Sequence, residues 1–318
     1  MAVVLCVGLT TVDVTQQVED FPEPGEKMQS LAAFTSPGGP AANAATAVAA
    51  LGHRAVLVTA TGADPLGALA LRGLADRRVE VVDAAPDGFR IALSMVVVRA
   101  GDGERTVVSR NAGGHLPAVP ADLPDRVAEA DVLLLDGHLG PLALAAARSA
   151  RERGVPVVLD AGSWKPVLDD LLPLVDVAAC SAAFPLTERA VHDRGVPLVI
   201  RTRGALPVTW SNRTTAEPAP SGPRAAGPDA AWAGTTPAGS AGPHDGPVVS
   251  TGEVPVTPVP VRDTNGAGDV WHGALAVALA RREPVARAVA WANEVAAVRV
   301  RNPAERWVEE LWRWRDSG

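Results

Sequence analysis

Short apolar runs alternate with longer, mostly alanine-rich runs along this 318-residue chain, and this alternation limits the possible folds most strongly. The short runs are apolar at successive positions, which is typical of strands buried on both faces of a parallel sheet. They predict strands at Val3–Val7, Ala55–Thr59, Val132–Leu135, Pro156–Leu159, Val175–Cys180 and Leu198–Ile200. The longer runs predict helices at Ala41–Ala50, Leu66–Arg77, Pro141–Arg153, Pro166–Leu172, Gly266–Arg281, Val285–Arg301 and Glu305–Arg315. Strands and helices in this order predict an α/β fold, with a mainly parallel sheet between two layers of helices.

Two stretches, residues 12–35 and 89–111, contain β-type sequence without the helices that separate strands elsewhere. The second stretch holds the pair Ala92–Val98 and Arg105–Ser109, joined by the turn Gly101-Asp102-Gly103. Two β-type runs around a glycine-containing turn are typical of a hairpin. We therefore expect a β-hairpin within this stretch.

Residues 211–247 differ in composition from the rest of the chain. Pro, Gly, Ala, Ser and Thr dominate this segment, and it has few large apolar residues to bury. It separates two predicted strands, Leu206–Trp210 and Val254–Val261. Because the entropy cost of closing a loop grows only logarithmically with its length, a hairpin tip tolerates such an insertion. The sequence predicts one domain over residues 1–318 that carries a flexible insertion at 211–247.

The overall composition excludes some classes of partner. The net charge is −7 and the basic residues form no run, so nothing in the sequence predicts binding to nucleic acid or to an anionic membrane. No apolar stretch reaches the roughly 18 residues of a membrane span. Cys6 and Cys180 lie in apolar runs, which is typical of buried thiols in a reducing compartment. We expect a soluble cytoplasmic protein.

The segment Asp263–Asp269, with the sequence Asp-Thr-Asn-Gly-Ala-Gly-Asp, carries the strongest functional signal. Its glycines allow several N–H groups to point at one place, directly before the apolar helical run Val270–Ala280. Free N–H donors and a partial positive charge at a helix N-terminus favour an anion such as phosphate. A carboxylate is repelled by such an anion, so Asp269 is better suited to accept a proton from an attacking hydroxyl than to bind. The alternative is a loop in which Asp269 only caps a helix.

The same segment resembles the D-T-x-G-A-G-D signature of the ribokinase-like (PfkB) carbohydrate kinases. A second motif, Gly38-Gly39-Pro40-Ala41-Ala42-Asn43, also resembles that family, and the two motifs occur in the family's order. The resemblance extends from about Val3 to Val300 and is closest to the branch that includes sulfofructose kinase. It implies a ribokinase-like three-layer α/β/α core, with residues 12–35 and 89–111 forming a small β-sheet lid that covers a sugar site and forms the contact of a homodimer.

The resemblance also implies an activity: transfer of the γ-phosphoryl group of ATP, with Mg²⁺, to a hydroxyl of a sugar or sugar derivative. Asp269 is the expected base, and the N–H groups of the Gly266-Ala267-Gly268 run are the expected anion hole. The expected substrate-binding residues are Asp13, Gly38, Gly39 and Asn43, with Lys27 and Asn111 from the lid segments. For Lys27, a solvated surface position is the alternative.

Expected nucleotide contacts are Arg203, Gly204, Thr264 and Asn293. The chain departs from the family where many relatives carry N-x-x-E, because Ser181-Ala182-Ala183-Phe184 stands there, and the residues that hold the metal are therefore unknown. Two other functions remain open: a nucleoside kinase, which would need aromatic stacking partners in the lid, and a catalytically weak sugar- or nucleotide-binding protein.

Overall fold

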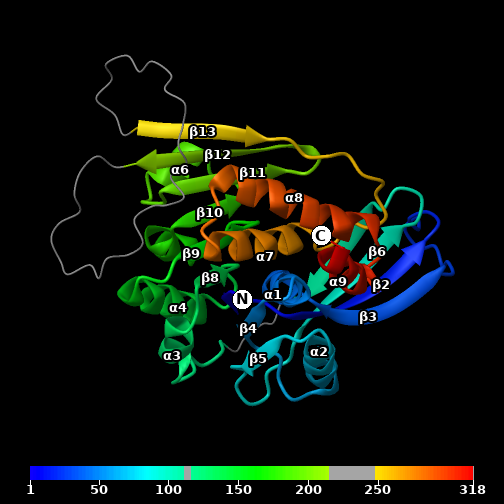
Figure 1. Cartoon of the computed structure of the whole chain (residues 1–318). Coiled ribbons are helices and arrows are strands. Elements are labelled where there is room, and N and C mark those ends of the chain that lie inside the picture. The colour runs from blue at the N-terminus through cyan, green and yellow to red at the C-terminus, as the bar shows by residue number, and fades with distance from the viewer. Residues whose placement is uncertain (111–115, 215–247, 318) are drawn as a thin grey trace.

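A computed structural model describes residues 1–110, 116–214 and 248–317, and it confirms the predicted α/β fold (Figure 1). One sheet has nine strands, and the other has four. The strands of the larger sheet, in spatial order, are β13 (Val248–Val254), β12 (Leu206–Thr214), β11 (Leu198–Arg203), β10 (Val177–Cys180), β9 (Val157–Ala161), β8 (Val132–Leu135), β1 (Val3–Val7), β4 (Arg54–Thr59) and β5 (Glu80–Asp83). Neighbours from β11 to β5 are parallel, whereas β12 and β13 are antiparallel.

Helices cover both faces of the large sheet, because its strands, such as β1, carry apolar side chains on both faces. Val4 and Cys6 belong to one hydrophobic core, while Leu5 and Val7 belong to the other, because successive side chains of a strand point to opposite faces. The first core contains α1 (Pro40–Ala50), α7 (Ala267–Ala280), α8 (Val285–Arg301) and α9 (Trp307–Ser317). The second contains α3 (Leu123–Ala128), α4 (Gly140–Arg153), α5 (Leu168–Leu171) and α6 (Glu188–His192), with the 3₁₀ turn Leu172–Leu174 after α5. A strand that is apolar at every position therefore supplies both cores.

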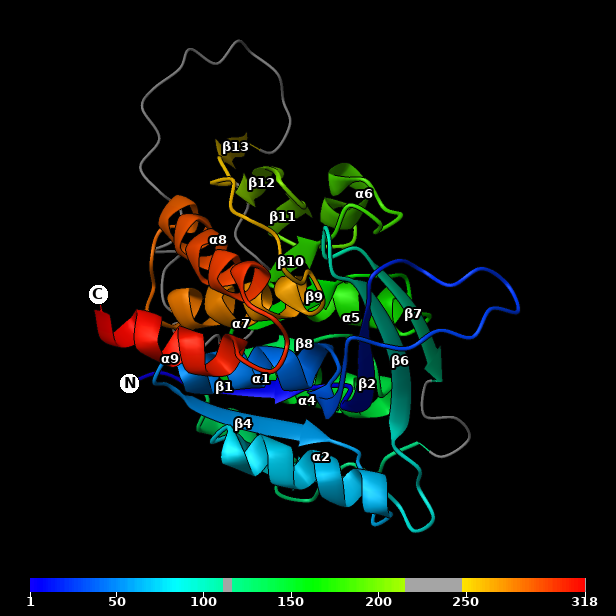
Figure 2. The same ribbon diagram turned by 90° about the vertical axis from the view of Figure 1, so that its right-hand side faces the viewer.

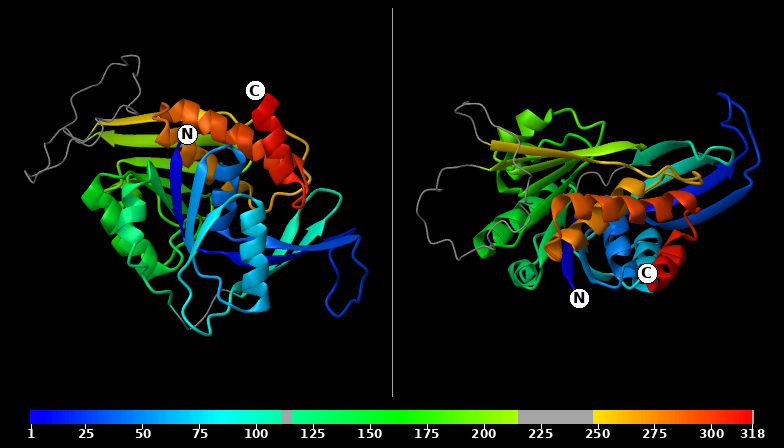
Figure 3. Two further views of the ribbon diagram at one scale, coloured as in Figure 1. Left: turned by 60° about the horizontal axis from the view of Figure 1, so that its bottom comes forward. Right: turned by 45° about the horizontal axis from the view of Figure 1, so that its top comes forward.

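The small sheet is mixed, with the order β3 (Ala32–Gly38), β2 (Thr11–Val18), β6 (Ala92–Arg99) and β7 (Arg105–Arg110). It extends from one edge of the body, and the loop between β2 and β3 projects furthest (Figures 2 and 3). Strand β2 begins only a few residues after β1 ends, so the small sheet starts at the carboxyl end of a central parallel strand. Open α/β sheets bind ligands at that end of their strands.

Helix α2 (Pro65–Asp76) joins the small sheet to the body. Its first turn is capped by Asp64, whose carboxylate accepts a hydrogen bond of 2.9 Å from the Gly67 N–H. The helix packs closely on β3, since a Cβ at Gly73 would lie 2.8 Å from Cδ of Pro37. The C-terminal end of α2 is thereby held beside the inner edge of the small sheet.

The hairpin at the edge of the large sheet differs from the expectation. Strand β12 extends to Thr214, past the expected start of the insertion at 211, and its partner is Val248–Val254 rather than Val254–Val261. The antiparallel register pairs Val208 with Val254 and continues to Thr214 and Val248. Beyond Val254 the prolines at 255, 258 and 260 lack the N–H groups that a ladder needs, which ends the strand. The remainder of the predicted insertion, residues 215–247, lies outside the described residues. No helix in the described ranges is both long and apolar enough to span a bilayer.

Candidate active site

The N-terminus of α7 presents free backbone donors, as the motif predicts. Gly266 caps the helix with φ of 70°, a conformation that glycine adopts without strain. The side chain of Asp263 accepts a hydrogen bond of 2.8 Å from the N–H of Asn265, which fixes the turn before the helix. The N–H of Ala267 donates over 3.3 Å to Thr264, whereas the described residues offer no acceptor to the N–H groups of Gly266 and Gly268.

Asp269 lies in the first turn of α7 and is held by a residue from the second motif. The amide nitrogen of Asn43, on α1, donates a hydrogen bond of 2.8 Å to Oδ2 of Asp269. Burial, and next the negative charge of Asp160, raise the pKa of Asp269 to about 6, and the hydrogen bond from Asn43 works in the opposite direction. The structure therefore brings the two motifs into direct contact and leaves Asp269 with a pKa near neutrality, which suits a general base.

Asp13 is buried at the inner face of the small sheet, within a row of hydroxyl side chains. Ser36 on β3 and Ser94 on β6 are its direct cross-strand neighbours. Its carboxylate accepts a hydrogen bond of 2.6 Å from Thr11, and burial is the main reason that its pKa is raised. A Cβ at Gly38 would lie 2.2 Å from Oδ2 of Asp13, so only glycine leaves room for the carboxylate.

Glycine is required at position 39 because the chain there lies against the backbone of Leu9. Its φ is 95°, and a Cβ there would lie 2.6 Å from the carbonyl oxygen of Leu9. The adjacent turn is fixed by the buried carboxylate of Asp136, which accepts hydrogen bonds from the N–H groups of Leu9 and Ala41 at 2.8 and 3.2 Å. The chain between β3 and α1 can therefore lie directly against the end of β1.

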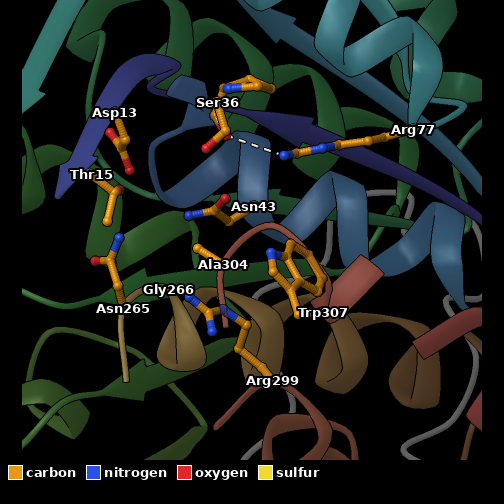
Figure 4. A pocket seen from close by; sticks show the side chains of 11 residues that line it. Asp13, Thr15, Ser36, Asn43, Arg77, Asn265, Gly266, Arg299, Ala304 and Trp307 are labelled. Atoms are coloured by element: carbon orange, nitrogen blue, oxygen red, sulfur yellow. Dashed lines mark hydrogen bonds between the residues drawn. The ribbon is translucent and has the colours of Figure 1, made fainter. Parts of the chain in front are cut away.

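These elements enclose a polar pocket (Figure 4). Three predicted site residues, Asp13, Asn43 and Gly266, line it. Residues that the sequence reasoning did not assign to a site complete the lining: Thr15, Ser36, Pro37, Arg77, Asn265, Arg299, Ala304 and Trp307. The side chains of Asp13, Asn43 and Asn265 converge on this space from β2, α1 and the loop before α7 (Figure 4).

A buried ion pair ties that loop to α8. Nη2 of Arg299 lies 2.6 Å from Oδ2 of Asp263, and both side chains are about 95% or more buried. Nη1 of Arg299 also donates to the main-chain oxygens of Asp263 and Asn302, at 3.3 and 2.9 Å. The guanidinium lies 5.9 Å from the ring centroid of Trp307. Asp263, the first residue of the motif, is thus held by an ion pair and a hydrogen bond with Arg299, and Arg299 itself lies beside the ring of Trp307.

A second buried ion pair lies behind Asp269. Nδ1 of His272, one helical turn after Asp269, is 3.2 Å from Oδ2 of Asp160 at the end of β9. The ring nitrogens make no well-directed hydrogen bond within the described structure, so the contact is electrostatic in character. Burial is the largest influence on the pKa of His272 and lowers it, but the charge and side-chain contact of Asp160 and the charge of Asp269 together outweigh burial, so the pKa is raised. Burial is likewise the largest influence on the pKa of Asp160 and raises it, but the charge and side-chain contact of His272, with the charges of Lys165 and His138, together outweigh burial, so the pKa is lowered.

The small sheet touches the motif loop directly. Arg105 on β7 donates a hydrogen bond through Nη1 to the hydroxyl of Thr264. At the tip of the same hairpin, a Cβ at Gly103 would lie 2.9 Å from the carbonyl oxygen of Arg262. The residues expected to form a lid therefore reach the loop that is expected to bind phosphate.

The remaining predicted residues lie outside this pocket. Lys27 is exposed in the projecting loop between β2 and β3, and Asn111 is outside the described residues. Gly204 forms the turn between β11 and β12, with φ of 63°, and Arg203 beside it donates to the carbonyl oxygen of Pro207 at 3.0 Å. The amide of Asn293 accepts from Trp271 at 2.8 Å and donates to Pro255 at 3.2 Å, so it links α8 to α7 and to the chain after β13.

No carboxylate replaces the N-x-x-E pair in the described structure. The hydroxyl of Ser181 donates to the carbonyl oxygen of Gly162 at 2.8 Å, and Phe184 is buried beside Trp164 with ring centroids 6.1 Å apart. Across the described ranges, no group of three or more His, Cys, Asp or Glu side chains could hold a metal ion. The residues present therefore do not fit a metal ion held by the protein alone.

Comparison with known proteins agrees with this fold. The profile of the pfkB family carbohydrate kinases matches residues 1–183 and 240–306, and the chain belongs to that family. It is 26% identical over 230 residues to a ribokinase of Haemophilus influenzae, covering 65% of this chain and 74% of that protein. It is 34% identical over 169 residues to an ATP-dependent ribose-1-phosphate kinase of Halopiger xanaduensis, covering 51% of this chain and 55% of that protein. The crystal structure of a ribokinase from Thermotoga maritima has the same fold, with a TM-score of 0.70 and 21% identity over 98% of this chain and 100% of that one.

Proposed function

We propose that this carbohydrate kinase transfers the γ-phosphoryl group of ATP to a hydroxyl of a sugar or sugar derivative, with Asp269 as the base. The observation that supports this most directly is the contact between Asn43 and Asp269. It places a carboxylate of raised pKa beside a loop with free N–H donors and next to a pocket lined by Asp13. A sugar hydroxyl in that pocket would have a proton acceptor and an anion-binding loop within reach.

The reaction requires one bond to form and one to break. The acceptor oxygen bonds to the γ-phosphorus, the bond from the γ-phosphorus to the β–γ bridging oxygen breaks, and ADP departs. The hydroxyl proton passes to Asp269, which at pH 7 is mostly ionised because its pKa is about 6. Phosphoryl transfer depends more on alignment and charge stabilisation than on a strong base, so a carboxylate suffices.

The other residues have supporting roles in this proposal. The N–H groups of Gly266 and Gly268, together with that of Ala267 at the helix N-terminus, would stabilise the charge on the transferred group. Asp13, Asn43 and the backbone at Gly38 and Gly39 would orient the acceptor through its hydroxyl groups. The contact between Arg105 and Thr264 would keep the small sheet closed over the site.

The residues proposed to bind ATP have less direct support than the residues proposed to bind the acceptor. ATP would bind at Arg203, Gly204, Thr264 and Asn293, and Mg²⁺ would be held by the ATP phosphates and water because the described residues lack a metal-binding cluster. Lys27 and Asn111 stay predictions for substrate contacts from the lid. A homodimer through the small sheet and a location in the cytoplasm also stay predictions.

The experiment is an assay of ADP release with Mg-ATP and a panel of ketoses, aldoses, sugar phosphates, sulfosugars and nucleosides, with Asp269→Asn beside the wild-type protein. ADP release that depends on a sugar and is lost in the variant supports the proposal. Turnover with nucleosides alone would indicate a nucleoside kinase. Sugar binding without turnover, in both proteins, would indicate a binding protein, the alternative suggested by the missing N-x-x-E carboxylate.

A further inference from the structure

Arg77 stands out among the residues of the pocket because the mechanism gives it no role. It follows the last turn of α2 and extends toward Ser36 at the inner edge of the small sheet (Figure 4). Its one hydrogen bond runs from Nη1 to the carbonyl oxygen of Pro37, at 3.1 Å. A guanidinium has five N–H donors, so most of the donors of Arg77 have no acceptor among the described residues.

The charge of Arg77 also lacks a direct partner. Within the described ranges, no carboxylate lies within 4.0 Å of it, whereas Arg299, the other arginine that lines the pocket, is paired with Asp263. Asp13 acts on Arg77 only from a longer distance, and its own oxygens are already engaged by Thr11 and neighbouring side chains. Removing a cation from water without a counter-ion is unfavourable.

Arg77 keeps its positive charge although its surroundings lower its pKa. Burial, and next the charge of Arg299, lower the pKa of Arg77 to about 10, so the guanidinium still remains charged at neutral pH. The hydroxyls of Thr15 and Ser36 line the same space and have no hydrogen-bond partner in the described structure. A half-buried guanidinium with spare donors beside two free hydroxyls is the donor set that binds an anionic group well.

We propose that the acceptor sugar carries an anionic group, such as a phosphate ester, sulfonate or carboxylate, and that Arg77 binds this group and thereby determines specificity. The inference rests on the proposed kinase function. In this arrangement the reacting hydroxyl faces Asp269, and the anionic group lies against Arg77, Ser36 and Thr15, so the cavity, about 20 Å³ in this structure, opens when the sugar binds. Arg77 is a binding residue here and takes no part in proton transfer.

The test compares sugars that differ only in the anionic group, such as fructose with its 6-phosphate and its 6-sulfonate, and glucose with glucuronate. Kinetics of ADP release are measured for the wild-type protein, Arg77→Gln and Arg77→Lys. The wild-type protein should prefer one anionic sugar over its neutral parent by about 10-fold to 100-fold in kcat/KM, the range of a hydrogen-bonded charge. Arg77→Gln should lose that preference through a higher KM, with kcat and the neutral sugar little changed, and Arg77→Lys should recover part of it.

Arg72→Gln is the matched control, because Arg72 lies on the same helix, carries the same charge and is exposed. It should leave both sugars unaffected, which separates a local contact from a general change in charge. Preference for neutral sugars in the wild-type protein, or equal losses for both sugars in Arg77→Gln, would overturn the inference. If no sugar supports ADP release, the kinase proposal fails separately, and calorimetric binding of the anionic sugars to wild-type and Arg77→Gln protein still decides the role of Arg77.

Discussion

The proposed acceptor side and the proposed nucleotide side of this protein are built differently. On the acceptor side, side chains from β2, α1, α2 and the loop before α7 meet in one pocket, and Asn43 binds Asp269 across 226 positions of sequence. On the nucleotide side, the predicted residues either lie in a turn, as Gly204 does, or are used within the protein, as the amide of Asn293 is. In this proposal the acceptor side depends on particular side chains, whereas on the nucleotide side the amide of Asn293 is used within the protein and Gly204 offers only its backbone.

This difference predicts different sensitivities to substitution. A buried side chain with one partner has no substitute, so its removal should change chemistry or stability strongly. Backbone donors remain when a side chain changes, so substitutions on the nucleotide side should be tolerated better. The following predictions test this contrast.

Asp269→Asn should lower kcat by about 10²- to 10⁴-fold, the range for loss of a general base. The amide keeps the shape of the side chain, so the dissociation constant for the acceptor sugar should change little. Both quantities are measured with the best acceptor, by ADP release and by calorimetry. A variant that keeps more than a tenth of the wild-type kcat would contradict the assignment of Asp269 as the base.

The same substitution should increase stability at pH 8. Because the pKa of Asp269 is raised in the folded protein, its contribution to stability is fully present below the pKa of the unfolded chain and is lost as the pH rises through about 6. At pH 8 the wild-type protein therefore carries an unfavourable buried charge, and Asp269→Asn removes it. Urea unfolding should show a gain of about 1–2 kcal/mol at pH 8, after allowance for partial exposure, and a smaller gain at pH 4.

Arg299→Ala should destabilise the protein by about 3–5 kcal/mol, because it leaves the carboxylate of Asp263 buried without its partner. Arg54→Ala is the control, since it breaks an exposed pair with Glu80 and should reduce stability by less than about 1 kcal/mol. Both are measured by urea unfolding at pH 7. Similar losses in the two variants would show that the motif loop does not depend on this buried ion pair.

Asn43→Ala removes the hydrogen bond that lowers the pKa of Asp269, so that pKa should rise further. The acid limb of kcat/KM should move to higher pH, and kcat/KM at pH 7 should fall by about 10-fold, as expected for a hydrogen bond to a charged group. The measurement is a pH profile of kcat/KM for the acceptor. An acid limb that moves to lower pH would show that Asn43 does not act on Asp269.

The sequence predicted the core of the fold closely and the edges less well. Strands Val3–Val7 and Val132–Leu135 and helix Val285–Arg301 have the predicted bounds, because continuous apolar runs and helical periodicity are local signals. The strand expected at Val254–Val261 is instead Val248–Val254, since its register is set by pairing with β12 and cannot be read from composition.

The same distinction applies to the site. Asp13, Asn43 and Gly266 were predicted from motifs and do line one pocket. Asn265 lies inside the motif, between residues that were assigned to the site, and that position is a local signal for its place in the pocket. Arg77 and Arg299 carry no local signal, because only the packing of α2 and α8 brings them to the pocket. Long-range packing of this kind is the part of a site that one sequence does not reveal.

On the nucleotide side, Arg203→Ala should raise the KM for ATP by no more than about threefold, since surface substitutions change free energies by about 0.5 kcal/mol. The guanidinium of Arg203 makes one hydrogen bond, to the carbonyl oxygen of Pro207, and this prediction assumes that backbone groups rather than its remaining donors hold the nucleotide phosphates. The KM for the acceptor should not change. A rise of more than 10-fold in the KM for ATP would show that this side chain contacts the nucleotide strongly and would weaken the contrast between the two sides.

The pH profile of acceptor kcat/KM at saturating Mg-ATP, for wild-type protein and Asp269→Asn, tests the central claim most directly. The free-enzyme pKa of Asp269 is about 6, so wild-type activity should rise as the pH increases through that value and then level off. The variant should be slow at every pH and lack this limb, while any titration of ATP itself would appear in both proteins. A variant that keeps both the limb and a rate within 10-fold of wild type would show that the proton goes elsewhere.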